Sequence, residues 1–296
     1  MLEIKLIVCP IDFSEFSVRA YRHALSLAEH YRSRLMAMHI VELWRYPYAD
    51  YAASVGDYEK FCHALCDGGK AQLREFLKKH TPAGVEPELA VLEGRAPDLI
   101  LSFAQERKAD LIVMGTHGRR GFDRWMLGTT TDRVMRRASC PVLGVCEAPP
   151  EAMTASKEGQ HVHRLTRILF CTDFSENSER ALRYAISATT EYDAELTLLH
   201  VLEKTPGSAR TDEAVATVTK QLDKLIPAEE RKGLKIKTAV RVGEPYAQIV
   251  QFAREEQIDT VVMAVRGRGA LNLAVFGSTT YRVMQLGCCP VLAVHV

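Results

Sequence analysis

The residues with the clearest capacity for chemistry form a glycine-rich stretch, residues 115–130, that follows a short apolar run. Gly115 and Gly118 are separated by two residues, and Gly128 follows after nine more, directly before Thr129. Glycine lets the backbone approach a ligand closely, and the helix predicted after Gly128 begins with unpaired N–H groups and the positive end of a helix dipole. This order of strand, glycine loop and helix predicts a site for a phosphate group.

An imperfect copy of this stretch lies near the other end of the chain. Ala264 stands where the first glycine is expected, and Gly267 is followed after nine residues by Gly277 and Ser278. Arginines lie in both loops, and Arg119 is a candidate cation for a phosphate. A purely structural role remains open for the glycines, as turn formers, and for the arginines, as solvated surface.

The repetition extends over the whole sequence. Residues 11–15 (IDFSE) match residues 172–176 (TDFSE), and residues 140–143 (CPVL) match residues 289–292 (CPVL). In both copies predicted strands alternate with predicted helices in five steps, which is typical of a parallel α/β sheet. The strands that open each copy are continuously apolar, as expected for a sheet covered on both faces.

We therefore expect two open five-stranded parallel-sheet α/β sandwich domains of Rossmann-like architecture. The first copy is residues 1–146 and the second copy is residues 164–296. Residues 147–163 contain two prolines and no apolar period, which predicts a linker. The last predicted strands, residues 142–146 and 291–296, are short apolar edges that need cover, so we expect the copies to pack as a pseudo-twofold pair.

An aspartate follows the first predicted strand of each copy, Asp12 in one and Asp173 in the other. Ligands of open parallel sheets bind at the carboxyl ends of strands where the strand order reverses, and Asp12 and Gly115 both occupy strand ends. Aspartate also favours helix starts, where Ser14 and Ser175 are the predicted N-caps. Capping and ligand binding are both open for Asp12, and they do not exclude each other.

The amino-acid composition and the net charge exclude some classes of function. The 296 residues are 47% hydrophobic and 25% charged, as in an ordinary globular protein. With 38 basic and 37 acidic side chains, the net charge is +1, so no general electrostatic field attracts nucleic acid or a membrane surface.

No apolar run reaches the roughly 20 residues of a membrane span. The beginning of the sequence does not resemble a signal peptide, and eight cysteines without a paired framework suggest buried reduced thiols, so we expect a cytoplasmic protein.

Neither a catalytic residue nor a metal site is predicted. Cys62, His63 and Cys66 fall within one helical turn, but zinc requires four ligands and a simple helix face is the alternative. Cys288 and Cys289 are adjacent, and Cys289 repeats the thiol that enters the last strand of the first copy. The sequence lacks the nucleophile elbow of hydrolases, the lysine-containing phosphate loop and the His-Glu-x-x-His motif.

Both copies resemble the universal stress protein family in its tandem form, over nearly the whole chain apart from the linker and residues 44–51. The resemblance rests on the spacing of Gly115, Gly118, Gly128 and Thr129, on Asp12, on His39-Ile40-Val41, and on Cys140-Pro141-Val142-Leu143. It implies a fold like that of the adenine nucleotide alpha hydrolases, binding of ATP, and pairing of the copies through their last strands.

The resemblance also implies roles for single residues. Asp12 and the Val41 backbone would hold adenine, Gly115 would lie on the ribose side, and the phosphates would meet Gly118, Gly128, Thr129 and Thr130. The corresponding residues of the second copy are Asp173, Gly267, Gly277 and Ser278. Because Ala264 replaces a glycine there, we expect one tightly bound nucleotide per chain, in the first copy, and a gain at the second site for Ala264→Gly.

The leading hypothesis is a cytoplasmic stress-response or regulatory protein that binds ATP, ADP or AMP, with or without Mg²⁺, and hydrolyses ATP slowly at most. The alternative is an interaction scaffold with vestigial pockets, whose aromatic loop at residues 44–51 meets an unknown protein partner. A nucleotidyl transferase lacks its signature loops. Neither nucleic acid nor a membrane is an expected partner, and a homodimer of the chain is left open.

Overall fold

The computed structural model describes residues 3–43, 55–117, 127–146, 165–203, 211–266 and 277–295. The chain divides into two compact units, one formed by residues 3–122 and 128–140 and the other mainly by residues 141–296. Within the described residues, no helix combines the length and the apolar character needed to cross a membrane.

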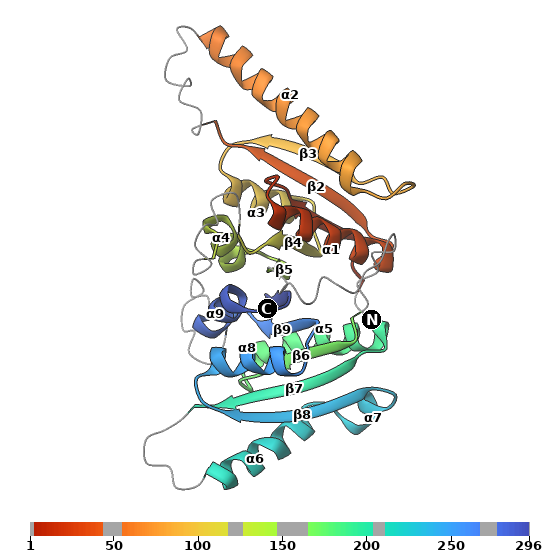
Figure 1. Cartoon of the computed structure of the whole chain (residues 1–296), viewed down its shortest axis with the longest axis vertical. Helices are drawn as coiled ribbons and strands as arrows, with labels where there is room; N and C mark the ends of the chain where they lie inside the picture. Colours follow the sequence, from red (N-terminus) through yellow and green to blue (C-terminus); the bar gives the residue numbers. More distant parts are fainter. Residues whose placement is uncertain are drawn as a thin grey trace. The chain divides into compact units, whose positions relative to one another are not determined.

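The first unit contains four parallel strands in the order β3-β2-β1-β4 (Figure 1). The strands are β1 (Leu6–Pro10), β2 (Arg34–Val41), β3 (Glu88–Glu93) and β4 (Leu111–Gly115). The helices are α1 (Glu15–Tyr31), α2 (Val55–His80), α3 (Ala96–Glu106) and α4 (Thr129–Arg137). The chain runs outward from β1 to β3 and returns through α3 to β4 on the other side of β1. The strand order therefore reverses between β1 and β4.

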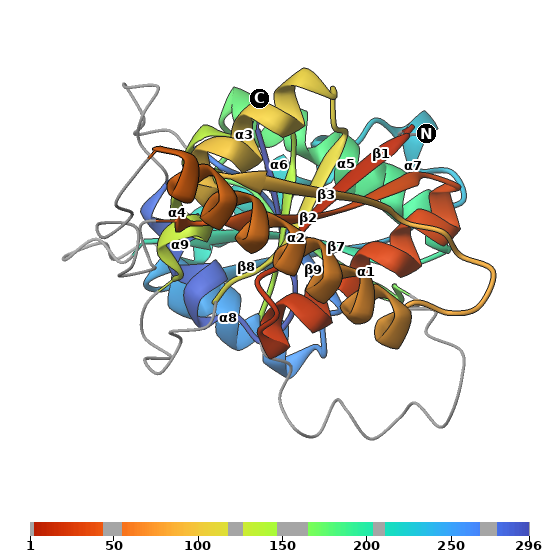
Figure 2. The same ribbon diagram turned by 90° about the horizontal axis from the view of Figure 1, so that it is seen from above.

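This reversal distributes the helices over both faces of the sheet, because crossovers between parallel strands are right-handed. In Figure 2, α1 and α2 lie on one side of β1, β2 and β3, and α3 lies on the other. Helix α1 packs on β1 and β4, and α3 packs against α4. With both faces covered, Ile7, Val8 and Cys9 of β1 are fully buried, as their continuous apolar character predicts.

The second unit contains six strands in the order β5-β10-β9-β6-β7-β8. They are β5 (Val142–Val145), β6 (Arg167–Cys171), β7 (Glu195–Leu202), β8 (Lys235–Val242), β9 (Thr260–Ala264) and β10 (Val291–Val294). The helices are α5 (Glu176–Tyr192), α6 (Thr211–Lys224), α7 (Ala228–Arg231), α8 (Pro245–Glu255) and α9 (Ser278–Leu286). All neighbours are parallel except β5 and β10, so strands of both copies build a mixed sheet.

The antiparallel pairing of β5 with β10 relates the last strands of the two copies. Leu143 lies opposite Leu292, which is the same position of the other copy, so a local pseudo-twofold axis passes between them. The α/β class with parallel Rossmann-like sheets is confirmed. Because β5 pairs with β10, the compact units divide between Cys140 and Pro141. The predicted domain limits stay a prediction, and the predicted linker lies outside the described residues.

The helix starts follow their sequence signals. The predicted N-caps are confirmed: the backbone N–H of Ser17 donates to Ser14 Oγ, and that of Ser178 donates to Ser175 Oγ, both at 3.2 Å. The helix after β7 does not continue to β8, since α6 ends at Lys224 and Pro227 precedes the short helix α7. Proline disfavours helical backbone at the residue before it, which explains the break.

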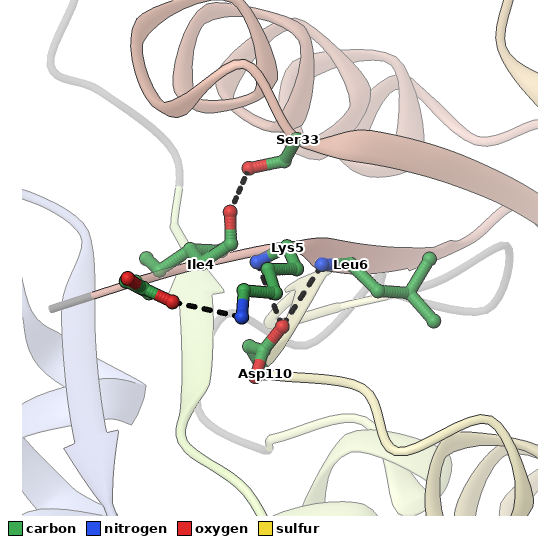
Figure 3. A network of polar contacts seen from close by, with 6 residues as sticks. Ile4, Lys5, Leu6, Ser33 and Asp110 are labelled. Atoms are coloured by element: carbon green, nitrogen blue, oxygen red, sulfur yellow. Dashed lines mark hydrogen bonds and ion pairs between the residues drawn. The ribbon is translucent and has the colours of Figure 1, made fainter.

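An aspartate fixes the amino end of the first strand in each copy. Asp110 Oδ2 accepts from the backbone N–H groups of Lys5 (2.8 Å) and Leu6 (2.9 Å), as Figure 3 shows. Asp259 Oδ2 binds the corresponding N–H groups of the second copy, those of Thr166 (2.7 Å) and Arg167 (2.9 Å). These bonds fix the amino ends of β1 and β6 relative to the strands beside them, β4 and β9.

Candidate functional site

The carboxyl ends of β1 and β4 lie side by side, because Ile7 pairs with Leu111 and Val8 with Ile112. Asp12 follows β1 and Gly115 ends β4, so the structure brings these two predicted site residues to the point where the strand order reverses. That point is the expected place for a ligand in an open parallel sheet.

Asp12 shapes the connection between β1 and α1. Its Oδ1 accepts from the backbone N–H (3.0 Å) and the hydroxyl (2.6 Å) of Ser14, and Phe13 between them has a positive φ of 65°. Ser14 is the N-cap itself, so Asp12 braces the cap and does not replace it. The side chain is half-buried. A structural role for Asp12 is therefore established, and it leaves a ligand role open.

The turn after β1 has a second support that the sequence did not suggest. His39 Nδ1 donates to the carbonyl of Ile11 at 2.7 Å, and its ring lies 4.5 Å from that of Phe13 between centroids. The second copy repeats this contact, with His200 Nδ1 donating to Thr172 at 2.8 Å. His39 and His200 therefore hold the turns before Asp12 and Asp173 in the two copies.

Val41 ends β2 and is buried. Its carbonyl accepts from the N–H of Gly94 at 3.1 Å, and in the second copy the carbonyl of Leu202 accepts from Gly243 at 2.8 Å. Leu202 therefore occupies the place of Val41. An adenine held by the Val41 carbonyl would have to share it with Gly94.

Gly115 is required by packing. A Cβ at this position would lie 2.8 Å from Phe16 Cβ and 3.1 Å from the Phe16 carbonyl carbon. Because these atoms are fixed to the backbone of α1, no change of rotamer relieves the contact. The close approach of α1 explains this glycine without reference to a ribose, and the glycine spacing alone does not reveal that contact.

The start of α4 is fastened to the end of β4. Gly128, the N-cap, donates its N–H to the Thr116 carbonyl at 2.9 Å, and Thr131 Oγ1 donates to the Gly115 carbonyl at 2.8 Å. No side chain among the described residues caps this helix. Thr129 is exposed and Thr130 half-buried, so the first turn of α4 presents its backbone N–H groups at the strand ends.

The second copy has the same fastening. Gly277 donates to the Val265 carbonyl at 2.9 Å, and Thr280 Oγ1 donates to the Ala264 carbonyl at 2.9 Å. Ser278 is the exposed first residue of α9. The buried threonines Thr131 and Thr280 were missed from the sequence, although their shared position in both repeats was a usable signal.

Asp173 repeats the contacts of Asp12. Its Oδ1 accepts from the N–H (3.0 Å) and the hydroxyl (2.6 Å) of Ser175. The remaining predicted site residues, Gly118, Arg119 and Gly267, lie outside the described residues, as does the aromatic loop at residues 44–51. Among the residues with described positions, no group of three His, Cys, Asp or Glu side chains has a metal-binding arrangement.

The fold and these strand ends define a class of protein. Its members have an open parallel α/β sheet, and at the point where the strand order reverses a helix begins at a glycine, here with no side-chain cap from the described residues. The model of the Universal stress protein family matches residues 3–145 and 164–295. The chain therefore belongs to the universal stress protein family and carries two of its domains in tandem.

Individual relatives agree with this. The chain is 36% identical over 141 residues to a universal stress protein of Methanocaldococcus jannaschii, a match that covers 48% of this chain and 81% of that protein. It is 22% identical over 308 residues to one of Synechocystis, covering 98% of this chain and 99% of the other. The crystal structure of a universal stress protein from Archaeoglobus fulgidus has the same fold, with a TM-score of 0.72, 20% identity and 99% coverage of both chains. A structure described as a universal stress protein in complex with cAMP covers 45% of this chain, at 18% identity and a TM-score of 0.37.

Proposed function

We propose that the chain is a stress-response or regulatory protein of the cytoplasm that binds an adenine nucleotide in its first copy. The nucleotide is ATP, ADP or AMP. Mg²⁺ binds with it where the negative charge of the phosphates requires a cation. The observation that carries this proposal is the start of α4, which presents backbone N–H groups beside the end of β4 and has no side-chain cap from the described residues. Helix starts of this kind bind phosphate groups.

Other helix starts in the same molecule support this assignment by contrast. Ser14 and Ser175 cap α1 and α5 with their hydroxyls, whereas α4 and α9 begin at glycines without a side-chain cap. The acidic residue in the first turn of α4, Asp132, is bound by Arg136 at 3.0 Å through both oxygens. Its charge is therefore compensated and opposes a phosphate less.

In this proposal the phosphates meet Gly118, Gly128, Thr129 and Thr130, with Arg119 as a cation, and adenine lies toward Asp12 and Val41. In the second copy Asp173, Gly267, Gly277 and Ser278 form a weaker site. No residue is assigned a catalytic role, so hydrolysis is slow at most.

The first test identifies the ligand. The full chain is purified without added nucleotide and denatured by heat, and the released small molecules are identified by mass. The nucleotide-free chain is then titrated calorimetrically with ATP, ADP and AMP, each with and without Mg²⁺. If nothing is released and none of the three binds, the nucleotide proposal is wrong and the interaction scaffold replaces it.

The second test removes one phosphate donor without removing the helix. Thr129 is the first residue of α4, where proline is favoured, and Gly128 has φ −56° and ψ 137°, a backbone that proline tolerates in its predecessor. We expect Thr129→Pro to keep the unfolding temperature and to weaken ATP binding by about 10- to 150-fold, as for loss of a hydrogen bond to a charged group. Ser278→Pro is the matched control and leaves the tight site unchanged. Wild-type affinity in Thr129→Pro would remove the phosphate assignment.

A further inference from the structure

Three cysteines meet where the last strands of the two copies pair. On β10 and β5, Val291 lies opposite Gly144 and Leu292 opposite Leu143. Continuing this register by two residues brings Cys289 opposite Cys146, and the two thiols are close enough for the charge on one to affect the pKa of the other. The thiols of the adjacent residues Cys288 and Cys289 shift each other's pKa in opposite directions, that of Cys288 downward and that of Cys289 upward.

The three thiols differ in their exposure to solvent and in the charged groups beside them. Cys146 and Cys289 are buried, whereas Cys288 is half-buried. The guanidinium of Arg254 on α8 contacts Cys288 and donates to the carbonyl of Leu286, the last residue of α9, at 3.4 Å. The hydrogen bond from Cys289 and the positive charge of Arg254 lower the pKa of the Cys288 thiol.

Other cysteines of the chain have the opposite setting. Burial raises the pKa of Cys140 to about 12 and also raises the pKa values of Cys9 and Cys171. In the first copy the position of Cys288 is taken by Ser139 and that of Arg254 by Gln105. The cysteine and the arginine are thus present together in the second copy and absent together from the first.

We propose that Cys146, Cys288 and Cys289 form a thiol relay, in which Cys288 reacts with a peroxide and the oxidation ends as a disulfide between Cys146 and Cys289. A thiolate is the nucleophile in such reactions, and the half-buried Cys288, which lies beside a cation, is more accessible to a peroxide than the buried Cys146 and Cys289.

The steps balance as follows. The Cys288 thiolate attacks one peroxide oxygen, so an S–O bond forms, the O–O bond breaks, and the other oxygen leaves as alkoxide or hydroxide and is protonated. Cys289 attacks the sulfur of the Cys288 sulfenic acid, and the S–O bond breaks with release of water. Cys146 then attacks the Cys289 sulfur and expels the Cys288 thiolate. Two thiols are oxidised to one disulfide, and one peroxide is reduced.

Geometry favours this final product. Adjacent residues have Cα atoms about 3.8 Å apart, which is shorter than the roughly 4.4–6.8 Å found in disulfides, so a bond between Cys288 and Cys289 is strained. Residues directly opposite each other on antiparallel strands have Cα atoms about 4.5–5.5 Å apart, within that range. The strained disulfide between Cys288 and Cys289 is therefore the more reactive one, and exchange with Cys146 relieves its strain.

The experiment treats the reduced full-length chain with hydrogen peroxide, quenches by alkylation, and maps peptides by mass without reduction. We expect the wild type to accumulate the Cys146–Cys289 disulfide with Cys288 still open to alkylation. Cys288→Ser should form it at least about tenfold more slowly, and Arg254→Gln about 3- to 10-fold more slowly. Serine and glutamine stand at these positions in the first copy, so both variants should fold.

Two further variants separate the steps. Cys146→Ser should stop at the Cys288–Cys289 disulfide, and Cys289→Ser should stop at a Cys288 sulfenic acid that dimedone traps. Cys140→Ser, the first-copy equivalent of Cys289→Ser, should behave as the wild type. The relay is wrong if Cys288→Ser is oxidised as fast as the wild type, or if peroxide oxidises Cys288 without producing a disulfide between Cys146 and Cys289.

Discussion

The starts of α4 and α9 share one construction and differ in the residues around it. In both, a glycine N–H binds the carbonyl after the strand at 2.9 Å, and a buried threonine binds the last strand carbonyl at 2.8–2.9 Å. What changes is the strand end, which is Gly115 in the first copy and Ala264 in the second. Both copies therefore offer the same backbone groups to a phosphate. Any difference in ligand binding must come from the residues around these groups.

The difference at the strand end concerns helix packing first. Gly115 has no room for a Cβ because α1 lies against it. Ala264 belongs to the same buried cluster as Ala181 and Ala185 of α5. The second copy therefore accommodates a methyl group at the position where the first copy requires a glycine.

The largest expected effect is an asymmetry of nucleotide affinity between the copies. We expect one tight site per chain and a second site weaker by about 5- to 150-fold, equivalent to about 1–3 kcal/mol. A calorimetric ATP titration that resolves two classes of site measures this ratio, with Thr129→Pro and Ser278→Pro assigning each site. Two equal tight sites would remove the asymmetry.

The same titration of Ala264→Gly tests its cause. If a methyl group beside the ribose weakens the second site, as the sequence suggested, this substitution strengthens it. In the first copy a Cβ at this place would lie 3.2 Å from the His117 carbonyl oxygen, at the start of the glycine loop, as well as against Phe16. We expect Ala264→Gly to strengthen the second site by about 5- to 150-fold, and an unchanged affinity would show that Ala264 is not the cause of the asymmetry.

The next largest expected effect is a loss of stability when Gly115 is replaced. Gly115→Ala should lower the free energy of unfolding by about 1–3 kcal/mol, the usual cost of overpacking, because α1 has to move. Ala264→Gly, the matched change, should cost about 0.5–1 kcal/mol through lost packing and added backbone freedom. Urea unfolding of both variants measures the difference. Equal, small losses would show that α1 is not held tightly against β4.

The smallest effect separates the two roles of Asp12. Asp12→Asn keeps an oxygen that can accept from Ser14, so stability should change by less than about 0.5 kcal/mol. If the carboxylate also contacts the nucleotide, ATP affinity should fall about fivefold, a loss of about 1 kcal/mol. Asp173→Asn is the control and should leave the tight site unchanged. Unaltered ATP binding in Asp12→Asn would leave this aspartate with a structural role alone.

Much of the fold is readable from the sequence, because local patterns determine it. The serine caps follow Asp12 and Asp173 as expected, and β4 leads into the glycine-rich stretch. The repeat itself made these predictions stronger, since each element was seen twice.

What the sequence did not reveal depends on contacts between distant residues. Periodicity does not show that Phe16 lies against Gly115, nor that Thr131 hydrogen-bonds a strand end 16 residues earlier. The sequence assigned Gly115 to a ligand, because glycine spacing looks the same whether a helix or a sugar approaches. The thiol cluster was hidden in a similar way, since only the register of β5 on β10 brings Cys146 to Cys289.

The pairing of β5 with β10 also has a consequence for how the chain folds. These strands lie at residues 142–145 and 291–294, so this contact spans the whole second copy in sequence. Contacts of such long range form late, because the entropy of closing a long loop precedes any gain from pairing. Until β10 arrives, the apolar strand β5 has an open edge that a second molecule can occupy through its own β10. At high concentration, refolding should therefore compete with strand exchange between molecules, and dilution should favour chains in which β5 pairs with β10 of the same molecule.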